Sequence, residues 1–360
     1  MPQLVLLLLC VCMLPACGSF LAAPAYQGPV TDRFNGKHFI NEGVKDKGLL
    51  DVLALSKDWI FKRQAWPDWV DATTDTVTHI SLSKQLSSNG KAFSSRPVRI
   101  QYINHSTFLI QFDDLTVLTD PVFSERVSPF SWIGPKRVHA PAVTIDALPH
   151  IDVVLISHNH YDHLDIDALK RITLRQATRP PLFLAGLGNA KYLTSRGLQN
   201  VRDLDWYDQV ALKSTSFYFT PAQHRSGRGL SDQMKTLWGS FLIKRGDDWR
   251  LYFAGDTGYS QHFKALRNRF GVMDVSLLPI GAYEPRWFMK GIHMDPKQAV
   301  QAHIDLGSRI SLGMHFGAFQ LTLESREQPL IDLSAALLAL GVPTSQFVSP
   351  EVGASYVVSQ

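Results

Sequence analysis

An apolar segment, residues 153–156, leads without a break into a cluster of side chains that commonly bind metal ions. Its four residues, Val-Val-Leu-Ile, predict a short strand that is buried on both faces. The cluster that follows contains His158, His160, Asp162 and His163. Three of the chain's 13 histidines fall within these six positions, so a His-rich surface loop is a poor explanation. We therefore predict a metal site held at the end of a rigid strand.

The spacing of these four side chains predicts two neighbouring metal positions. His158 and His160 are two residues apart, so in an extended turn both can face one point. Asp162 and His163 follow where the chain should bend towards a helix, and they can face a second point nearby. Imidazole and carboxylate suit zinc or another first-row metal better than calcium or magnesium. Thiolate ligands are not expected, because all three cysteines lie before residue 18.

Length and composition predict a globular protein with a large core. The 360 residues are 45% apolar and 19% charged, which is ordinary for a folded protein of one or two domains. The formal net charge is only +4 at pH 7, and no run of lysine or arginine stands out. We therefore predict no nucleic-acid partner.

The first 17 residues (1–17) are predicted to be a signal peptide with a lipobox. Leu4 to Met13 is an apolar run that is too short to span a bilayer but fits the core of a signal peptide. The following Leu-Pro-Ala-Cys-Gly resembles a bacterial lipobox and would make Cys17 the lipidated first residue of the mature protein. The alternative is an ordinary signal peptide that is cut near Ala22 or Ala23. The lipobox predicts a lipid-anchored periplasmic protein of a bacterial cell envelope.

Residues 18–96 are predicted to form a tether and an N-terminal extension. Asp46 to Phe61 is loosely helical, and Trp59, Trp66 and Trp69 cluster around a proline. These tryptophans either pack the extension against the main domain or form a lip for an apolar substrate or a membrane surface.

Residues 97–360 are predicted to form one domain of strands and helices. Strands are expected over residues 98–103, 107–112, 115–118, 151–156, 182–185, 201–206, 217–220, 238–244, 249–254, 275–279, 310–312 and 355–358. Helices are expected over residues 166–171, 190–196, 295–307 and 330–340. This order indicates an α/β fold with two sheets face to face and helices outside.

Further metal-type side chains come soon after other predicted strands. They are His224, Asp256 and His315. Ligands that are scattered along the sequence can converge if their strand ends lie at one edge of the sandwich. Together with the first cluster, they make a set of seven candidate ligands.

Several segments together resemble one known family. They are residues 118–121 (Leu-Thr-Asp-Pro), 157–165 (Ser-His-Asn-His-Tyr-Asp-His-Leu-Asp), 254–259 (Ala-Gly-Asp-Thr-Gly-Tyr) and 278–290, with support from 134–137 and 237–240. They are similar to the metallo-β-lactamase superfamily, and especially to its N-acylphosphatidylethanolamine-hydrolysing phospholipase D branch. The resemblance covers about residues 97–360 and implies a metallo-β-lactamase αββα sandwich with an N-terminal extension.

The resemblance also implies a site for two zinc ions (Zn2+). The first ion would be held by His158, His160 and His224, and the second by Asp162, His163 and His315, with Asp256 bridging both. Two cations roughly 3.5–4 Å apart can share a hydroxide and can clamp both oxygens of a displacement at phosphorus.

Two further residues are expected to act in catalysis beside Asp256. His293 matches a family histidine, and it lies just before a predicted helix start, where a phosphate is favoured. We expect it to contact the phosphate or to donate a proton to the leaving oxygen. Asp120 is expected to orient a ligand histidine. Tyr283, Arg286, Trp287 and Phe288 either contact substrate or only pack. The family's Gly-His-Ala turn is replaced here by residues 104–106, Asn-His-Ser.

The leading hypothesis is therefore a zinc phosphodiesterase of phospholipase D type. It would hydrolyse N-acylphosphatidylethanolamine-like phospholipids to phosphatidate and N-acylethanolamine. The expected partners are this phospholipid and a membrane surface, and a homodimer is left open. The alternatives are a zinc lactonase or amide hydrolase of the same fold, and an envelope binding protein without activity.

Overall fold

The computed structural model describes residues 22–41, 43–44, 47–82, 97–246 and 249–359. The predicted signal peptide and the three cysteines therefore lie outside the described residues. Within these ranges, no helix combines the length and the apolar character that are needed to cross a membrane.

The first sheet has eight strands. Their spatial order is β1 (Val77–Ser81), β15 (Ser355–Ser359), β2 (Val98–Asn104), β3 (Thr107–Gln111), β4 (Thr116–Thr119), β5 (Val153–Ile156), β6 (Leu182–Gly186) and β7 (Val201–Leu204). Strands β4 to β7 are parallel, whereas β15, β2, β3 and β4 pair in an antiparallel way.

The second sheet has seven strands. Their order is β14 (Phe347–Val348), β13 (Ile310–Met314), β12 (Val275–Pro279), β11 (Trp249–Phe253), β10 (Ser240–Arg245), β9 (Thr215–Thr220) and β8 (Gln209–Leu212). Strands β11 to β14 are parallel, and β8 to β11 pair in an antiparallel way.

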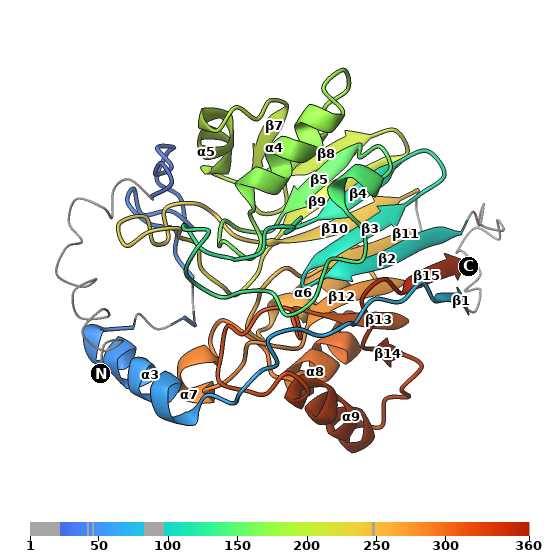
Figure 1. The fold of residues 1–360 in the computed structure, drawn as a ribbon. Helices are drawn as coiled ribbons and strands as arrows, with labels where there is room; N and C mark the ends of the chain where they lie inside the picture. The colour runs from blue at the N-terminus through green and yellow to red at the C-terminus, as the bar shows by residue number, and fades with distance from the viewer. Residues whose placement is uncertain (1–21, 42, 45–46, 83–96, 247–248, 360) are drawn as a thin grey trace.

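Helices cover the outer face of each sheet (Figure 1). Helices α4 (Ile166–Arg175) and α5 (Asn189–Ser195) lie over the first sheet, whereas α6 (His262–Phe270), α8 (Pro296–Leu306) and α9 (Gln328–Leu340) lie over the second. Helix α3 (Leu49–Lys62), the short α7 (Arg286–Met289) and a 3₁₀ turn, η1 (Ile145–Ala147), complete the described helices. This arrangement confirms the predicted αββα sandwich.

Strand β5 shows why its sequence is a continuous apolar run. Val153 and Leu155 pack in the core between the two sheets, and Val154 and Ile156 pack against α4 and α5. All four side chains have an exposed fraction of 0%. A strand that is buried on both faces cannot alternate with polar residues, so the prediction from sequence is confirmed here.

Local signals placed most elements correctly, and the structure adds several that we did not predict. Helix α8 begins after the capping residue Asp295 and ends at Gly307 with a φ of +63°, as the sequence predicts.

Strands β1, β8 and β14 and helices α6 and α7 were not predicted from the sequence. Strand β1 belongs to the predicted extension, and its side chains are mostly exposed, so it lacks a clear apolar pattern. Its partner β15 lies at the far end of the chain. The domain boundary near residue 97 stays a prediction.

Part of the extension packs into the core of the sandwich. The rings of Tyr26, Phe34 and Phe39 lie 4.8–5.3 Å apart, and Phe34 and Phe39 are only 2% exposed. The amide of Phe39 donates to the carbonyl of Met234, at 2.7 Å. The extension is therefore anchored next to the loop that precedes β10.

Replacing Phe39 by alanine is expected to lower the free energy of unfolding by about 3–5 kcal/mol, because it leaves a cavity in a packed aromatic cluster. Urea unfolding followed by circular dichroism would measure this change. The matched control is Phe61→Ala, since the Phe61 side chain is 76% exposed and its loss should matter little. Equal effects of the two substitutions would contradict the prediction.

Candidate functional site

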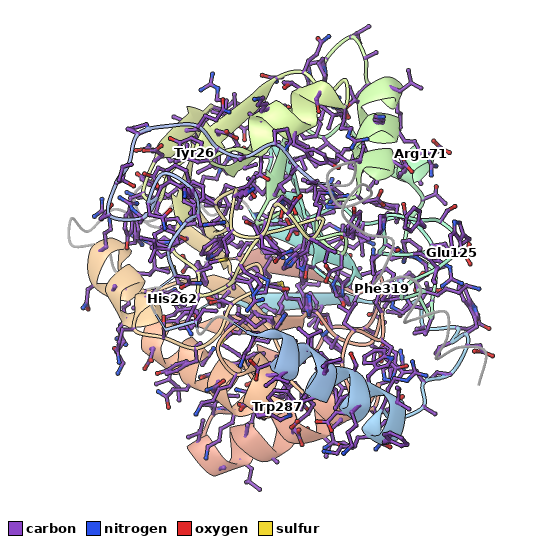
Figure 2. The ribbon with its side chains drawn as sticks, turned by 90° about the vertical axis from the view of Figure 1, so that its left-hand side faces the viewer. Tyr26, Glu125, Arg171, His262, Trp287 and Phe319 are labelled. Carbon is purple, nitrogen blue, oxygen red and sulfur yellow. The ribbon has the colours of Figure 1, made fainter. Side chains whose placement is uncertain are left out.

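The predicted ligands meet at one edge of the sandwich because they follow the carboxyl ends of strands that run in the same direction. His158 to His163 follow β5, and Asp256 follows β11. His224 follows β9, and His315 follows β13 directly. In Figure 2 the viewer faces this side of the molecule, where Phe319 marks the site. Its ring centroid is 5.3 Å from that of His105.

Three histidines form the first donor group. The Nδ1 atom of His160 lies 2.8 Å from Nε2 of His158 and 3.3 Å from Nε2 of His224. The side chains of His158 and His224 are each 1% exposed. Three ring nitrogens at this spacing can face one cation, so the structure brings together the three residues that were predicted for the first metal.

A second donor group surrounds the carboxylate of Asp162. Its Oδ2 atom lies 3.2 Å from Nε2 of His315 and 3.4 Å from Nε2 of His163. The Nε2 atom of His105 lies 3.2 Å from the same oxygen. The first two contacts join the predicted second set, whereas His105 is a residue that the sequence analysis did not place in the site.

Asp256 lies between the two groups. Its Oδ2 atom is 3.1 Å from Nε2 of both His163 and His315. The same oxygen is 3.7 Å from Nε2 of His224 and 3.9 Å from Nε2 of His158. One carboxylate therefore reaches donors of both groups, which is the position that a bridging ligand requires.

Burial controls the protonation of the first donor group. It lowers the pKa of His158 and His224 well below the ordinary value, and it lowers the pKa of His160 to about 4. These imidazoles are therefore neutral at pH 7, and a neutral ring nitrogen is the form that binds a metal ion.

The second group carries negative charge that needs a cation. Burial raises the pKa of Asp256, but His163 and His315 outweigh it and hold this pKa well below its usual range. Burial lowers the pKa of His315, but Asp256 and Asp162 outweigh it and raise this pKa to about 9. Protons on these rings or a metal ion can compensate the two carboxylates, and metal binding would release those protons.

Buried polar atoms without hydrogen-bond partners also indicate that the two donor groups fit a metal site. The Oδ1 atom of Asp256 and the Nδ1 atom of His293 are buried and have no hydrogen-bond partner. Buried polar atoms without partners are rare and need an explanation, and a bound cation is one. The donor set of imidazole and carboxylate matches zinc and other first-row metals, so the metal that binds and the number of ions stay open.

Asp120 supports the site from behind. Its Oδ2 atom accepts a hydrogen bond from Nδ1 of His163 at 2.6 Å and another from the hydroxyl of Ser157 at 2.6 Å. The hydroxyl of Ser157 also lies 2.9 Å from Nδ1 of His158. Asp120 thus lies where it can hold the His163 ring with Nε2 directed at the metal position.

The substitution Asp120→Asn is expected to weaken metal binding at the second group about 10–100-fold, because an amide accepts the His163 hydrogen bond less strongly than a carboxylate does. Titration with a chromophoric chelator would measure the affinity. Asp152→Asn is the control, since Asp152 precedes β5 and lies at the opposite end of this strand. Unchanged affinity in the Asp120 variant would contradict the prediction.

His293 reaches the same cluster. Its Nε2 atom lies 3.9 Å from Oδ2 of Asp256, and its Nδ1 atom is buried without a hydrogen-bond partner. Burial lowers its pKa to about 3, so the ring is neutral at pH 7. A neutral imidazole can donate a hydrogen bond to a phosphate oxygen, whereas giving up a proton as an acid would require the charged ring. The contact role is therefore favoured over proton donation.

The neighbouring aromatic and cationic residues are mostly structural. The hydroxyl of Tyr283 donates to Asp332, and the Nη1 atom of Arg286 donates to the carbonyl of His293 at 3.0 Å. Trp287 is 46% exposed, and its indole nitrogen donates to Asp58 of α3. Arg286 therefore holds the His293 loop, and Trp287 connects this loop to the extension.

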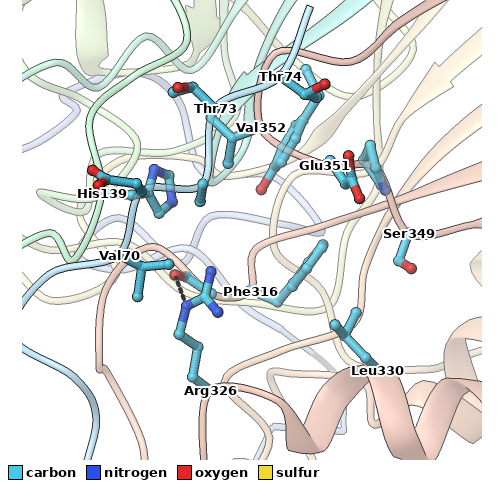
Figure 3. A pocket seen from close by; sticks show the side chains of 15 residues that line it. Val70, Thr73, Thr74, His139, Phe316, Arg326, Leu330, Ser349, Glu351 and Val352 are labelled. Carbon is cyan, nitrogen blue, oxygen red and sulfur yellow. Dashed lines mark hydrogen bonds between the residues drawn. The ribbon is translucent and has the colours of Figure 1, made fainter. Parts of the chain in front are cut away.

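A pocket of about 490 Å3 lies beside the loop that carries His315 (Figure 3). Phe316 and Gly317 line it, and Arg326 projects into it and donates from Nε to the carbonyl of Gly317. Neither donor group lines this pocket. Arg326 therefore steadies the His315 loop from outside the site.

Comparison with known proteins gives one family and several relatives. Residues 116–316 match the family model of the beta-lactamase superfamily domain. An uncharacterized protein of Mycobacterium tuberculosis is 42% identical over 242 residues, which are 66% of this chain and 63% of that protein. The N-acyl-phosphatidylethanolamine-hydrolyzing phospholipase D 1 of Caenorhabditis elegans is 37% identical over 231 residues, 61% of this chain and 64% of that protein. The chain thus spans less than two thirds of the length of these relatives.

Solved structures agree on the fold. The crystal structure of a possible metal-dependent hydrolase from Veillonella parvula matches 72% of this chain and 99% of its own, with a TM-score of 0.58 and 18% identity. At this identity the match is evidence for the fold and not for a shared activity.

Proposed function

The chain belongs to the β-lactamase superfamily and has the metallo-β-lactamase fold, and we propose that it is a metal-dependent hydrolase, specifically a phosphodiesterase of phospholipase D type. Its substrate would be an N-acylphosphatidylethanolamine-like phospholipid, as the name of the Caenorhabditis elegans relative suggests. The observation that carries the proposal is the carboxylate of Asp256, whose Oδ2 atom lies within 3.9 Å of histidines of both donor groups. Two adjacent cations are suited to a displacement at phosphorus.

Each side chain of the site would have a separate role in hydrolysis. Metal ions held by the two groups, which we propose to be zinc, would lower the pKa of a water molecule and attract the phosphodiester oxygens. Asp256 would hold the two groups in one arrangement, and Asp120 would keep His163 directed at them. The Nε2–H group of His293 would donate to a phosphate oxygen. The water oxygen would end on phosphatidate, and a proton would end on the released N-acylethanolamine.

Exposed apolar side chains on α3 and on the loop that carries Trp132 support a lipid substrate. Leu50 and Phe61 of α3 are 81% and 76% exposed, and Trp132 is 71% exposed. In Figure 2, α3 (blue) crosses the front of the molecule near Trp287, which it also contacts through Asp58. Exposed apolar residues of this size suit an interface with lipid. We propose that these residues touch a bilayer, with a lipid anchor at Cys17 of an exported envelope protein.

The experiment for this proposal measures metal content and hydrolysis on the purified chain that starts at residue 18. We expect the zinc-loaded protein to release N-acylethanolamine. A chelator should abolish this activity, and added zinc should restore it. Cleavage of lactones or amides without cleavage of phospholipids or bis-p-nitrophenyl phosphate would replace the proposal by the alternative hydrolase. A protein that binds metal but cleaves none of these compounds would point to a binding protein.

Membrane contact is tested separately. The double variant Leu50→Ser and Phe61→Ser is expected to bind phosphatidylethanolamine vesicles about tenfold more weakly, because each serine removes apolar area that would enter the bilayer. Sedimentation with vesicles measures the bound fraction. Leu338→Ser is the matched control, since Leu338 of α9 is 86% exposed on another helix. Equal binding by all three proteins would contradict the proposed contact.

A further inference from the structure

We propose that His105 is a positioning residue that holds Asp162 in the second donor group and thereby sets the metal affinity of that half of the site. The inference rests on the proposed metal-dependent function. It concerns a residue outside the set of seven candidate ligands, and it is carried by contacts that only the folded chain makes.

The backbone places His105 in a tight turn with an unusual conformation. The turn joins β2 to β3 through His105 and Ser106, and the φ angle of His105 is +48°. This left-handed region is uncommon for a residue other than glycine, and it persists only where the surroundings impose it. Here the carbonyl of Ser106 accepts a hydrogen bond from the hydroxyl of Thr119 at 2.8 Å, and the hydroxyl of Thr107 donates to the carbonyl of Asp120 at 2.7 Å.

His105 connects two members of the second group that come from different sheets. Its ring nitrogen Nε2 lies 3.2 Å from Oδ2 of Asp162, which follows β5 of the first sheet. Its carbonyl accepts a hydrogen bond from the amide of His315, which follows β13 of the second sheet, at 2.9 Å. The ring centroids of His105 and His315 are 4.1 Å apart. One residue thus fixes the carboxylate and the imidazole relative to each other.

The contact has the polarity of a hydrogen bond from His105 to Asp162. A carboxylate can only accept, so Nε2 carries the hydrogen atom in this contact. The Nδ1 atom of His105 is buried and has no partner, which leaves it as the unprotonated nitrogen. The side chain is 1% exposed and cannot exchange this contact for water. A buried hydrogen bond to a charged group contributes more than one in water.

The contact of His105 with Asp162 at 3.2 Å favours positioning over direct metal binding, because it occupies the Nε2 atom. Among the described histidines, His158, His163, His224, His293 and His315 have Nε2 within 3.9 Å of Oδ2 of Asp256. Neither His105 nor His160 is in this set, and His105 shares a group of donor atoms within 4.8 Å of one another with Asp162, His163 and His315, so direct ligation is the competing role that the test below must distinguish. Partners of this kind typically change metal affinity 10–100-fold when they are removed.

The test compares the wild-type full chain with the variants His105→Ala and His105→Gln. Glutamine keeps an N–H donor that can reach Asp162, whereas alanine removes it. His303→Ala is the matched control, since His303 is also buried but lies in α8 and contacts Ser311 at 2.8 Å. Zinc content after dialysis is measured by mass spectrometry, and affinity is measured by competition with a chelator. The absorption spectrum of the cobalt-loaded proteins reports the geometry of each bound ion.

We expect His105→Ala to keep one tightly bound ion and to bind the second 10–100-fold more weakly, and His105→Gln to stay within a few-fold of wild type. Retention of the first ion shows that the variant is folded. Equal losses in the alanine and glutamine variants would overturn positioning in favour of direct ligation. Wild-type affinity in His105→Ala would overturn the inference alone. A wild-type protein that binds no metal would overturn the proposed function instead.

Discussion

Asp256→Asn is expected to abolish hydrolysis, with a loss of at least about a thousandfold in kcat/KM, which corresponds to about 4 kcal/mol. The Oδ2 atom of Asp256 reaches donors of both groups, at 3.1 Å for His163 and 3.7 Å for His224. Asparagine keeps the size of the side chain but removes the negative charge that would hold two cations together. Metal content should therefore fall together with turnover, and both are measured on the same preparation.

The matched control for this substitution is Asp203→Asn. The Asp203 carboxylate accepts hydrogen bonds from the amides of Gly188 and Ala190 at the start of α5, each at 2.6 Å. Asparagine at position 203 is expected to lower the stability of the fold by weakening these two hydrogen bonds, and to leave the metal content unchanged. Thermal melts of both variants are therefore compared. An Asp256 variant that keeps its metal and more than a tenth of wild-type turnover would refute the bridging role.

His293→Ala is expected to reduce kcat about 10²–10³-fold while metal content stays at the wild-type value. The Nε2 atom of His293 lies 3.9 Å from Oδ2 of Asp256, and burial keeps its ring neutral with a pKa of about 3. A preorganised donor of this kind stabilises charge that develops on a phosphate oxygen, and losing one such donor typically costs this much. Steady-state kinetics with a phosphodiester, together with zinc analysis, would measure both quantities.

The role of His293 as donor has a competing interpretation within the site itself. His224, Asp256 and His293 also lie close enough together to hold one cation. If His293→Ala loses one metal ion, then His293 is a ligand, and if it keeps both its metal and full turnover, then it has neither role. The control is His262→Ala, since His262 is a partly buried histidine at the start of α6 whose Nδ1 atom lies 2.6 Å from the hydroxyl of Ser260.

Local patterns were sufficient for the fold and for the composition of the candidate site. The apolar run of β5 predicted a strand buried on both faces, and the Asp295–Gly307 pair predicted both ends of α8. The resemblance to the metallo-β-lactamase superfamily is confirmed by the match over residues 116–316. The seven predicted ligands do lie together, and their role as ligands stays a prediction that the metal analyses above would test.

Contacts between distant parts of the chain could not be predicted in this way. Strand β1 has a weak pattern, and only its pairing with β15 makes it a strand. The packing of Phe39 against the core depends on a surface that forms after folding. His105 was visible only as the middle of an Asn-His-Ser turn, which also follows a strand. Its contact with Asp162 joins residues that are 57 positions apart.

The sequence by itself determined which chemical groups this protein can bring to a metal ion and on which strands they lie, because apolar periodicity and ligand type are properties of short segments. The tertiary structure alone decided which nitrogen and oxygen atoms face each other. It set Asp256 between the two donor groups, placed Asp120 behind His163, and brought His105 to Asp162. The physical reason is that these distances depend on how two sheets pack on each other, and that packing is a sum of contacts over the whole chain.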